Sequence, residues 1–270
     1  MALQIIFSTI VSIALFFLPL YTSANEYSSV NFSYTGPHNG PEKWGSLSPL
    51  FAACSHGESQ SPVNLNKSYI VFNKDLKSLD KHYIPTNATL VNNKFNIGVQ
   101  FGGKVGDINI NGKNYSLKQL HWHSPAEHRA NGRIHVAELH LVHKSEDNEI
   151  AVIAMLYKLG NPDPIISKIE DKLIELGRGH SNTQIAIGTF YIKELNRRPH
   201  RYFRYIGSLT TPPCTEGVHW NILGKLRTIS EKQLELLKGP LDPTCKINAR
   251  PIQPINDRKI QMYFKPNHIS

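Results

Sequence analysis

"LHWHSPAEHRANGRIHVAELHLVH", from Leu120 to His143, is the stretch of sequence that decides the expected fold. Polar and apolar residues alternate at both of its ends, as they do in β-strands, and Asn131-Gly132 between them indicates a turn. Side chains two residues apart share one face of a strand, so His121 and His123 point the same way. A second strand that folds back antiparallel beside the first brings His140 to the same face.

Three neutral imidazoles on one face predict a zinc site of the catalytic kind. They suit Zn²⁺ and leave one of the four tetrahedral positions open to water. Gln119 and Glu138 each lie two residues before a histidine of the cluster, on the same face, where they can accept a hydrogen bond from its other ring N–H. His-x-His by itself is a weak signal. The alternatives are three separately hydrogen-bonded histidines and, for Glu138, a simple salt bridge.

The rest of the chain predicts a mainly β fold, a single domain with a large, mostly antiparallel central sheet and a few short surface helices. Strand-like runs separated by turn signals occupy residues 89–101, 107–110, 115–123, 134–143, 150–158, 202–206 and 218–226. One helix is expected over residues 164–176, with Asp163 as its cap and Gly177 after its end, and another begins after Ser230. The N-terminal stretch up to residue 68 is expected to wrap the sheet as irregular chain.

The first 24 residues have the composition of a secretory signal peptide. An apolar run over residues 5–20 is followed by Thr22-Ser23-Ala24, which predicts cleavage after Ala24 and a mature domain of residues 25–270. The run is short for a membrane span, and no later stretch is long enough to be one. We therefore expect a secreted, extracellular protein (in the apoplast if the source is a plant), with an organelle reached through the secretory route as the alternative.

The net charge of +9 raises the question of a nucleic-acid partner. The lysines and arginines are scattered, and the dense cluster comprises Arg197, Arg198, His200, Arg201 and Arg204. Aromatic residues alternate there as in a strand. We interpret the cluster as a solvated strand face and expect no nucleic-acid binding.

Export would expose the cysteines to oxidation and the glycosylation motifs to glycan attachment. An oxidising compartment permits one disulfide among Cys54, Cys214 and Cys245 and leaves one thiol over. Acceptor motifs for N-linked glycans begin at Asn31, Asn66, Asn87 and Asn114. We expect at least one of these asparagines to carry a glycan.

Motifs spread over nearly the whole expected mature chain resemble the α-class carbonic anhydrases, in particular secreted plant members. They are "NGPEKWG" at 39–45, "QSPVNL" at 60–65, the histidine stretch, "GSLTTPPCTEGVHW" at 207–220 and "NARPIQP" at 248–254. The resemblance implies reversible hydration of CO₂ to bicarbonate and a proton by residues 25–270, with Zn²⁺ held by the three histidines. It also implies that Thr210 donates to Glu127 and accepts from zinc-bound hydroxide, which orients the attack on the substrate carbon.

The same resemblance implies roles for other residues around the zinc. The Asn248 carbonyl is expected to hold His123. A CO₂ pocket is expected to be lined by Val142, Val152, Leu209, Thr211, Val218 and Trp220. Solvent in the cavity is expected to be ordered by Thr211, Tyr34 and Asn93.

Two further implications concern the cysteines and the proton path. The resemblance pairs Cys54 with Cys214, and Cys245 has no partner, which leaves a monomer or a Cys245-linked dimer. Fast members of the family carry a histidine that relays protons where this chain has Phe95, and phenylalanine cannot titrate. We therefore expect a slower hydratase. The alternative is a storage or binding protein on the same scaffold, as in relatives with degraded sites.

Overall fold

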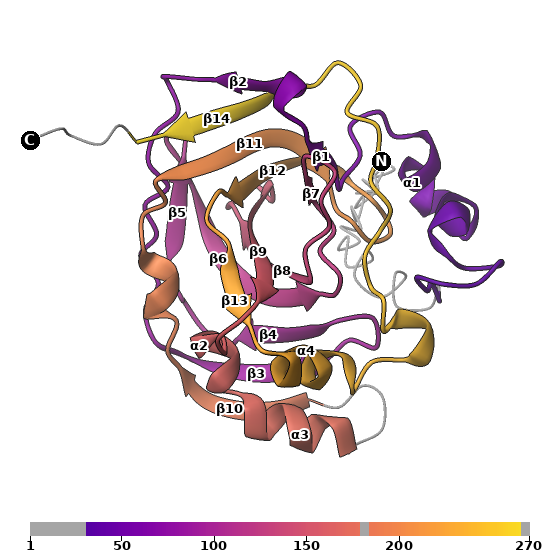
Figure 1. Ribbon diagram of the computed structural model, residues 1–270, viewed down its shortest axis with the longest axis vertical. Coiled ribbons are helices and arrows are strands. Elements are labelled where there is room, and N and C mark those ends of the chain that lie inside the picture. Colours follow the sequence, from indigo (N-terminus) through magenta and orange to yellow (C-terminus); the bar gives the residue numbers. More distant parts are fainter. Residues whose placement is uncertain (1–30, 179–183, 266–270) are drawn as a thin grey trace, which may run out of the picture. The chain divides into compact units, whose positions relative to one another are not determined.

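The histidine stretch supplies two neighbouring strands, β6 (Lys113–His123) and β8 (Ala137–Lys144), at the centre of this computed structural model (Figure 1). They pair antiparallel, with His121 opposite His140 and His123 opposite Glu138. The predicted antiparallel arrangement of the histidine strands is therefore confirmed. The structure describes residues 31–178 and 184–265, so the predicted signal peptide lies outside the described residues.

A single sheet organises the described chain, and its strands keep the antiparallel character that the sequence predicts. The other strands of this sheet are β2 (Ile70–Phe72), β3 (Thr86–Asn92), β4 (Ile97–Phe101), β5 (Asp107–Ile110), β9 (Ile150–Leu159), β10 (Gln184–Phe190), β11 (Arg201–Ser208), β12 (Glu216–Leu223), β13 (Arg227–Ile229) and β14 (Ile260–Phe264). Ten of its 12 strands follow the order β10-β3-β4-β6-β8-β9-β12-β11-β14-β2, while β5 pairs with β6 and β13 with β9. Only β9–β12, β9–β13 and β14–β2 are parallel among these described pairs. A separate parallel pair joins β1 (Asn64–Leu65) to β7 (Arg129–Ala130).

The turn between β5 and β6 shows how local sequence fixes the register of the sheet. Asn111 and Gly112 have φ values of 51° and 88°, so both residues lie in the left-handed region. Two such residues form the tight turn whose twist matches antiparallel strands, and asparagine followed by glycine is the sequence that favours it. Ile110 therefore pairs directly with Lys113.

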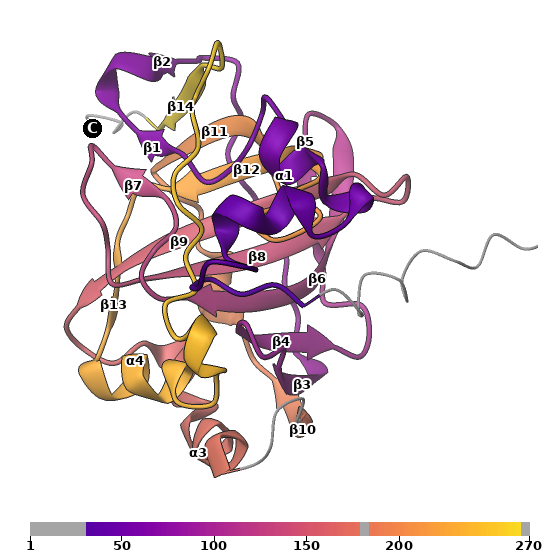
Figure 2. The same cartoon turned by 90° about the vertical axis from the view of Figure 1, so that its right-hand side faces the viewer.

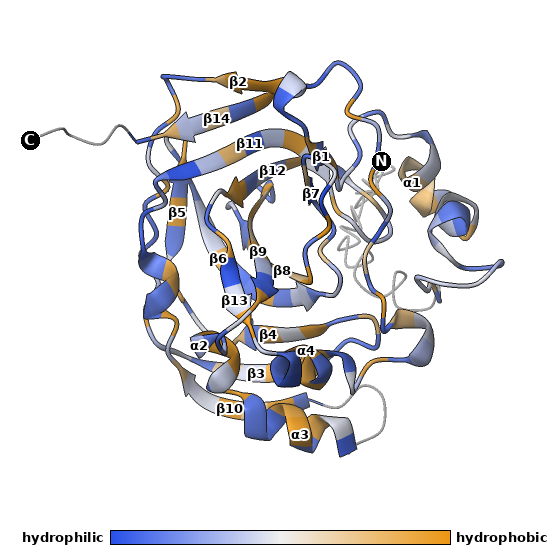
Figure 3. Ribbon diagram, in the orientation of Figure 1, coloured by the Kyte–Doolittle hydropathy of each residue, from blue (hydrophilic) through white to orange (hydrophobic). Residues whose placement is uncertain are grey.

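Short helices lie against the sheet, as the sequence predicts. They are the α-helices α1 (Ala53–His56), α2 (Pro164–Ser167), α3 (Glu170–Arg178) and α4 (Glu231–Lys238), and the 3₁₀ helices η1 (Pro41–Ser46), η2 (Pro49–Phe51), η3 (Lys67–Tyr69), η4 (Lys193–Asn196) and η5 (Pro243–Cys245). Figure 1 shows α3 beside β10, β3 and α4, with which it is in contact. Both α3 and α4 carry hydrophobic and hydrophilic residues, as expected of helices with one buried side (Figure 3). No helix in the described ranges is long and apolar enough to cross a membrane.

The two faces of the sheet pack into different cores. Leu139 and Leu141 of β8 and Met155 of β9 belong to a large apolar cluster that includes residues of α2, α3 and α4. Val152 and Trp220 belong to a smaller cluster, which lies on the face that carries the histidines. Figure 2 shows α1 and the C-terminal segment before β14 crossing in front of the sheet. The N-terminal region therefore covers the sheet as predicted, although short 3₁₀ helices interrupt its irregular chain.

Several predicted boundaries are wrong for local reasons. The run 89–101 forms two strands because Lys94 takes a left-handed φ of 69° in the turn between β3 and β4. The helix expected over 164–176 is two helices, and Gly177 lies inside the second of them. The strand expected from residue 134 begins only at Ala137.

The interpretation of the arginine cluster as a solvated strand face is also wrong in part. Arg197, Arg198 and His200 precede β11 rather than lie in it. Arg204 is buried, donates from Nε to the Asn221 side chain at 2.7 Å and lies over a tyrosine ring. The sequence pattern did not distinguish this buried arginine from its exposed neighbours.

Candidate metal centre

Three imidazoles converge on the face of the sheet that carries β8 residues 138, 140 and 142. One ring nitrogen from each of His121, His123 and His140 lies within 4.8 Å of the other two. The remaining ring nitrogens each meet an acceptor: His121 Nδ1 with Gln119 Oε1 at 2.9 Å, His123 Nδ1 with the Asn248 carbonyl at 2.6 Å, and His140 Nε2 with Glu138 Oε1 at 2.8 Å. The structure thus places Gln119 and Glu138 where strand periodicity predicted them, and Asn248 where the family resemblance implied it.

These acceptors determine which nitrogen of each ring carries hydrogen. Because the outer nitrogens donate, the inner nitrogens of the neutral rings present only lone pairs. His121 Nε2 and His140 Nδ1 are 3.3 Å apart, and His123 Nε2 is buried with no hydrogen-bond partner among the described residues. Two lone pairs cannot bond to each other, and an unpaired buried nitrogen is costly.

A zinc ion fits this set of donors. Tetrahedral Zn²⁺ with Zn–N distances of about 2.0–2.1 Å separates its nitrogen ligands by roughly 3.3–3.5 Å. The 3.3 Å between His121 Nε2 and His140 Nδ1 agrees with that value. The cluster is consistent with the zinc site of a metalloenzyme, and three protein ligands leave a fourth position open.

Burial keeps the three imidazoles in the neutral form that binds metals. Desolvation lowers the pKa of His123 to about 4, despite the hydrogen bond to Asn248. Burial also lowers the pKa of His140, and it combines with the other two imidazoles to hold the pKa of His121 well below its usual value. The rings therefore present lone pairs at neutral pH.

Glu138 is held by more than the metal-site histidine. Its Oε2 accepts the backbone N–H groups of Glu127 and His128 at 2.9 and 2.8 Å, and its Oε1 accepts from the His128 ring at 2.6 Å as well as from His140. Burial alone would raise its pKa, but His128, His140 and their hydrogen bonds outweigh burial and hold it well below the usual value. This network is more extensive than the simple salt bridge considered from the sequence.

Sequence reasoning missed His128 and the residues that follow it in this network. The other ring nitrogen of His128 lies 2.7 Å from the Tyr205 hydroxyl, which lies 2.8 Å from the Ser61 hydroxyl. Tyr205 is on β11 and Ser61 belongs to the "QSPVNL" motif. The only sequence signal for His128 is its position directly after Glu127.

Glu127 and Thr210, predicted as a pair, lie together beside the histidines. Glu127 is buried, and its Oε1 accepts the backbone N–H of Arg250 at 2.9 Å. Its Oε2 makes no hydrogen bond of good geometry within the described chain, but the Thr210 hydroxyl is close enough to lower its pKa. Burial nevertheless dominates and raises the pKa of Glu127 to about 7.

The loop that carries Thr210 is fixed at several points. Cys214 forms a disulfide with Cys54, as the family resemblance implied. The backbone N–H of Cys214 donates to Thr211 O at 2.8 Å, and the indole N–H of Trp220 donates to Ser208 O at 2.9 Å. These contacts hold the loop against the sheet next to the imidazoles.

An apolar wall lies beside the histidines, made of residues that the family resemblance assigned to a CO₂ pocket. Its members belong to one cluster with the Trp220 ring: Val142, Val152, Leu209 and Val218. The Trp220 ring is 4.9 Å from that of His140, centroid to centroid. Thr211 follows Leu209 and Thr210 and is half-buried. A wall of this kind suits a small apolar molecule better than a charged one.

The predicted solvent-ordering residues lie near the centre but differ in their contacts. Tyr34 is buried, its hydroxyl has no hydrogen-bond partner in the described ranges, and burial together with Glu127 holds its pKa well above its usual value. Asn93 donates from its side-chain amide to Asn96 at 2.8 Å. It also borders Gly98, which pairs with His121.

Phe95, at the expected proton-relay position, packs in an aromatic cluster. Its ring lies 5.0 Å from that of Phe32, centroid to centroid. The side-chain amide of Asn248 donates to the Phe95 carbonyl at 2.9 Å, so one residue anchors both His123 and the segment that carries Phe95. No titratable side chain occupies position 95.

The unpaired cysteine and the glycan motifs differ in accessibility. Cys245 is a free thiol that is only 3% exposed, and burial raises its pKa. An interchain disulfide needs an accessible thiol, so this burial argues against a disulfide from Cys245 to a second chain. The four glycan-motif asparagines are exposed or half-exposed: Asn31, Asn66, Asn87 and Asn114.

Comparison with known proteins places this geometry in a family. The family model of the eukaryotic-type carbonic anhydrases matches residues 39–264. Alpha carbonic anhydrase 7 of Arabidopsis thaliana is 41% identical over 233 residues, which cover 83% of this chain and 81% of the relative.

Two solved structures share the fold. Dioscorin complexed with ascorbate superposes with a TM-score of 0.85 at 37% identity, covering 88% of this chain and 99% of that one. The alpha-carbonic anhydrase of Thermovibrio ammonificans, in complex with the inhibitor sulfanilamide, gives a TM-score of 0.76 at 33% identity, covering 86% and 99%. With the family model, these similarities and the histidine cluster in agreement, the chain belongs to the α-class, or eukaryotic-type, carbonic anhydrase family.

Proposed function

We propose that the chain is a zinc-dependent hydratase that interconverts CO₂ with bicarbonate and a proton. The observation that carries the proposal is the set of three inner imidazole nitrogens that face one another within 4.8 Å, with His123 Nε2 lacking any hydrogen-bond partner among the described residues, although all three rings are anchored from outside. Family membership supports the same reaction. The neighbouring Thr210 and Glu127 are the groups that such a site needs to orient a nucleophile.

The zinc would be held by Nε2 of His121, Nε2 of His123 and Nδ1 of His140. When bound, it supplies a Lewis acid that lowers the pKa of a coordinated water from about 15.7 to about 7, so that a nucleophile exists at neutral pH. Gln119, Glu138 and the Asn248 carbonyl keep the rings oriented. Glu138 also makes the His140 ring a stronger donor, because a carboxylate stabilises positive charge on the imidazole.

Thr210 is proposed to orient the nucleophile by the direction of its hydroxyl. When Glu127 is ionised, a form that a zinc ion bound nearby would favour, it can only accept hydrogen bonds, and the Arg250 N–H already occupies its Oε1. The Thr210 hydroxyl must therefore donate to Glu127, and its oxygen is left to accept from an O–H on the open side of the site. That constraint fixes one lone pair of the nucleophile toward the substrate carbon.

The apolar wall is proposed to hold CO₂ beside this nucleophile. CO₂ has no net charge and no strong hydrogen-bonding group, so Val142, Val152, Leu209, Val218 and Trp220 can exclude water without a penalty for the substrate. Thr211, Tyr34 and Asn93 are proposed to order the remaining solvent. Proton removal is proposed to be slow, since Phe95 offers no titratable group.

A binding protein on the same scaffold is the second candidate function. Dioscorin, which superposes closely on this chain, was solved in complex with ascorbate, and this observation favours a role in binding a small molecule. The full set of histidines, together with Thr210 and Glu127, argues against this second function.

The predicted export of residues 25–270 agrees with the disulfide, because disulfides persist in oxidising compartments.

One pair of measurements separates the two functions. The zinc-loaded chain is assayed for CO₂ hydration by stopped-flow with a pH indicator, and for ascorbate binding by calorimetry. A hydratase accelerates hydration well above the buffer rate and loses that rate when sulfanilamide is added. Ascorbate binding without any acceleration would reject the hydratase and support the binding protein.

A further inference from the structure

The arginine-rich segment before β11 lines a cavity on the other face of the sheet from the histidines. The cavity has a volume of about 1060 Å³, and Met155 of β9 forms part of its wall. The preceding residue, Ala154, pairs with His140. Because successive side chains of a strand point to opposite faces, Met155 and the cavity lie on the face away from His140. The cavity is therefore separate from the proposed zinc site.

Cations outnumber carboxylates around this cavity. The permanently charged cations that line it are Arg197, Arg198, Arg201, Lys225 and Arg227, and His200 lies among them. Asp163 and Glu194 are the two carboxylates that line it. Asp163 binds Arg227, and Glu194 binds Lys168 at 2.8 Å. Both carboxylates are thus already neutralised.

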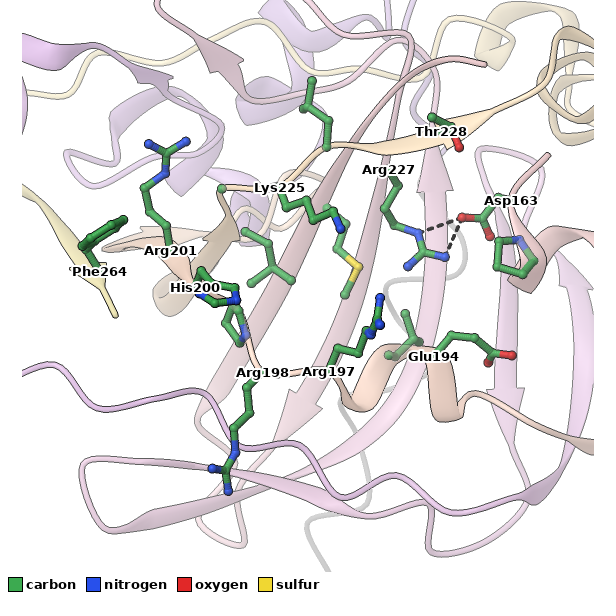
Figure 4. Close-up of a pocket in the computed structure, with 17 residues that line it drawn as sticks. Asp163, Glu194, Arg197, Arg198, His200, Arg201, Lys225, Arg227, Thr228 and Phe264 are labelled. Carbon is green, nitrogen blue, oxygen red and sulfur yellow. Dashed lines mark hydrogen bonds and ion pairs between the residues drawn. The ribbon is translucent and has the colours of Figure 1, made fainter. Parts of the chain in front are cut away.

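After these pairings, three cations of the lining have no carboxylate partner. Arg198 forms an ion pair with Asp80 at 2.8 Å and points away from the centre of the pocket in Figure 4. In the described part of the chain, no carboxylate pairs with Arg197, Arg201 or Lys225. An excess of positive charge lining a cleft attracts anions more strongly than the same charge on a flat surface.

Two of the lining residues are anchored by contacts within the protein: Arg227 through its side chain and Arg197 through its backbone. Asp163 fixes Arg227 through both Nε and Nη2, at 2.7 and 2.6 Å, and the guanidinium lies over the Tyr157 ring. The backbone of Arg197 is held by Lys81, a residue that is only 3% exposed and whose ammonium donates to Arg197 O at 2.7 Å. Figure 4 shows the guanidinium groups of Arg197 and Arg227 and the ammonium of Lys225 pointing toward the same part of the pocket.

The remaining lining is apolar, which limits the kind of anion that fits. Its apolar members are Met155, Leu195, Leu223, Leu226 and Phe264. Small-molecule sites in proteins typically enclose roughly 300–1,000 Å³, and they combine an apolar lining with a few polar groups that fix orientation. A bare inorganic ion would leave most of this apolar surface in contact with water.

We propose that this cavity binds a small phosphate monoester with an apolar or aromatic body. The guanidinium of Arg197 and the ammonium of Lys225, which have no carboxylate partner, can share the charge of a dianion, and a guanidinium matches phosphate oxygens in bidentate geometry. A carboxylate carries half the charge and meets fewer of the donors. The apolar lining then contacts the organic part of the ligand.

Calorimetry on the zinc-loaded full chain tests the site, with phenyl phosphate as the probe and sulfanilamide present throughout to occupy the metal centre. We expect phenyl phosphate to bind more tightly than inorganic phosphate and benzoate, and benzyl alcohol not to bind. Arg197→Gln and Lys225→Gln should each weaken binding about tenfold, the scale of losing one charge-assisted hydrogen bond. Lys104→Gln, an exposed cation away from the cavity, is the charge-matched control and should leave binding unchanged.

Three results would overturn the proposal. The first is no measurable binding of phenyl phosphate. The second is equal binding by the parent chain, Arg197→Gln and Lys225→Gln, which would place the ligand elsewhere. The third is loss of binding in His140→Ala measured without sulfanilamide, which would assign the phosphate to the metal centre. Because Arg197 and Lys225 are exposed, thermal unfolding of both variants should match the parent and exclude a folding defect.

Discussion

His140 and His143 are two buried histidines on the same strand that face opposite sides of the sheet. His143 has both ring nitrogens satisfied, Nε2 by the Tyr83 hydroxyl at 2.7 Å and Nδ1 by the Ala151 carbonyl at 3.2 Å. Burial lowers its pKa to about 3. His140 has only its outer nitrogen committed, to Glu138, while its inner nitrogen faces two other imidazoles.

Burial alone therefore does not mark a functional histidine. Both imidazoles are buried, both have lowered pKa values and both lie in β8. What separates them is that the protein completes the hydrogen bonding of His143 and leaves that of the His121, His123 and His140 cluster open. An open donor set is stable only if something else, such as a metal ion, completes it.

The same substitution on the two faces gives the largest expected contrast. His140→Ala should lose most of the bound zinc and nearly all CO₂ hydration, because two imidazoles cannot hold the ion as three do. His143→Ala should keep zinc and activity but lower the free energy of unfolding by about 1–3 kcal/mol, since the Tyr83 hydroxyl loses its partner. Elemental analysis, stopped-flow hydration and urea unfolding measure the three effects. Zinc loss from His143→Ala but not from His140→Ala would reverse the comparison.

A substitution of Thr210 tests whether the sheet face that carries the three-histidine cluster orients a nucleophile as well as binding a metal. Thr210→Ala should keep zinc and reduce the hydration rate on the order of 10²-fold, a scale typical of removing an orienting or stabilising group. Thr210→Ser keeps the hydroxyl and is the matched control, which should retain most of the rate. Equal rates for the alanine variant and the parent enzyme would remove Thr210 from the chemistry.

A substitution of Glu138 tests the hydrogen bonds that hold the histidine cluster from outside. Glu138→Gln keeps the shape but removes the charge that holds His140 and His128, so zinc affinity should fall by about 10- to 100-fold. Competition with a zinc chelator measures this affinity. Glu146→Gln, which alters an exposed carboxylate, should leave it unchanged. If both variants bind zinc like the parent, the Glu138 network serves only the fold.

A substitution of Phe95 has the smallest expected effect, and it concerns the release of protons from the site. Turnover needs proton release, so the parent enzyme should depend on small buffers that enter the cavity. Phe95→His should raise kcat in weak buffer by about tenfold, the low end of what a positioned acid–base group contributes, while kcat/KM stays nearly constant. Stopped-flow rates at low and high imidazole concentrations measure both. A parent enzyme that is fast and indifferent to buffer would show that another group relays the proton.

Much of the histidine cluster could be predicted from the sequence because strand periodicity determines which side chains share a face of the sheet. Residues two apart share a face, which is enough to align His121, His123 and Glu138 with His140 once the strands pair. The partners from distant segments, such as Asn248 and Cys214, were expected only through the family resemblance. Periodicity carries no information on contacts between segments more than 100 residues apart.

The features that were not predicted depend on tertiary contacts or on backbone conformation. His128 lies in a loop, where no repeat indicates the direction of a side chain. Lys94 takes a left-handed φ, which lysine rarely adopts and the sequence does not signal. Arg204 is buried because Asn221 on the neighbouring strand accepts from it, and Arg197 lines a cavity because other segments close around it.

We propose that the three open imidazole nitrogens hold one zinc ion and that CO₂ hydration requires this ion. Stripping the protein with a chelator and adding zinc back in steps, while hydration is followed by stopped-flow, tests this proposal. We expect no activity without metal, a linear rise up to about one zinc per chain, as a single three-histidine site implies, and no increase beyond it. Full activity in the stripped protein, or none at one zinc per chain, would contradict it.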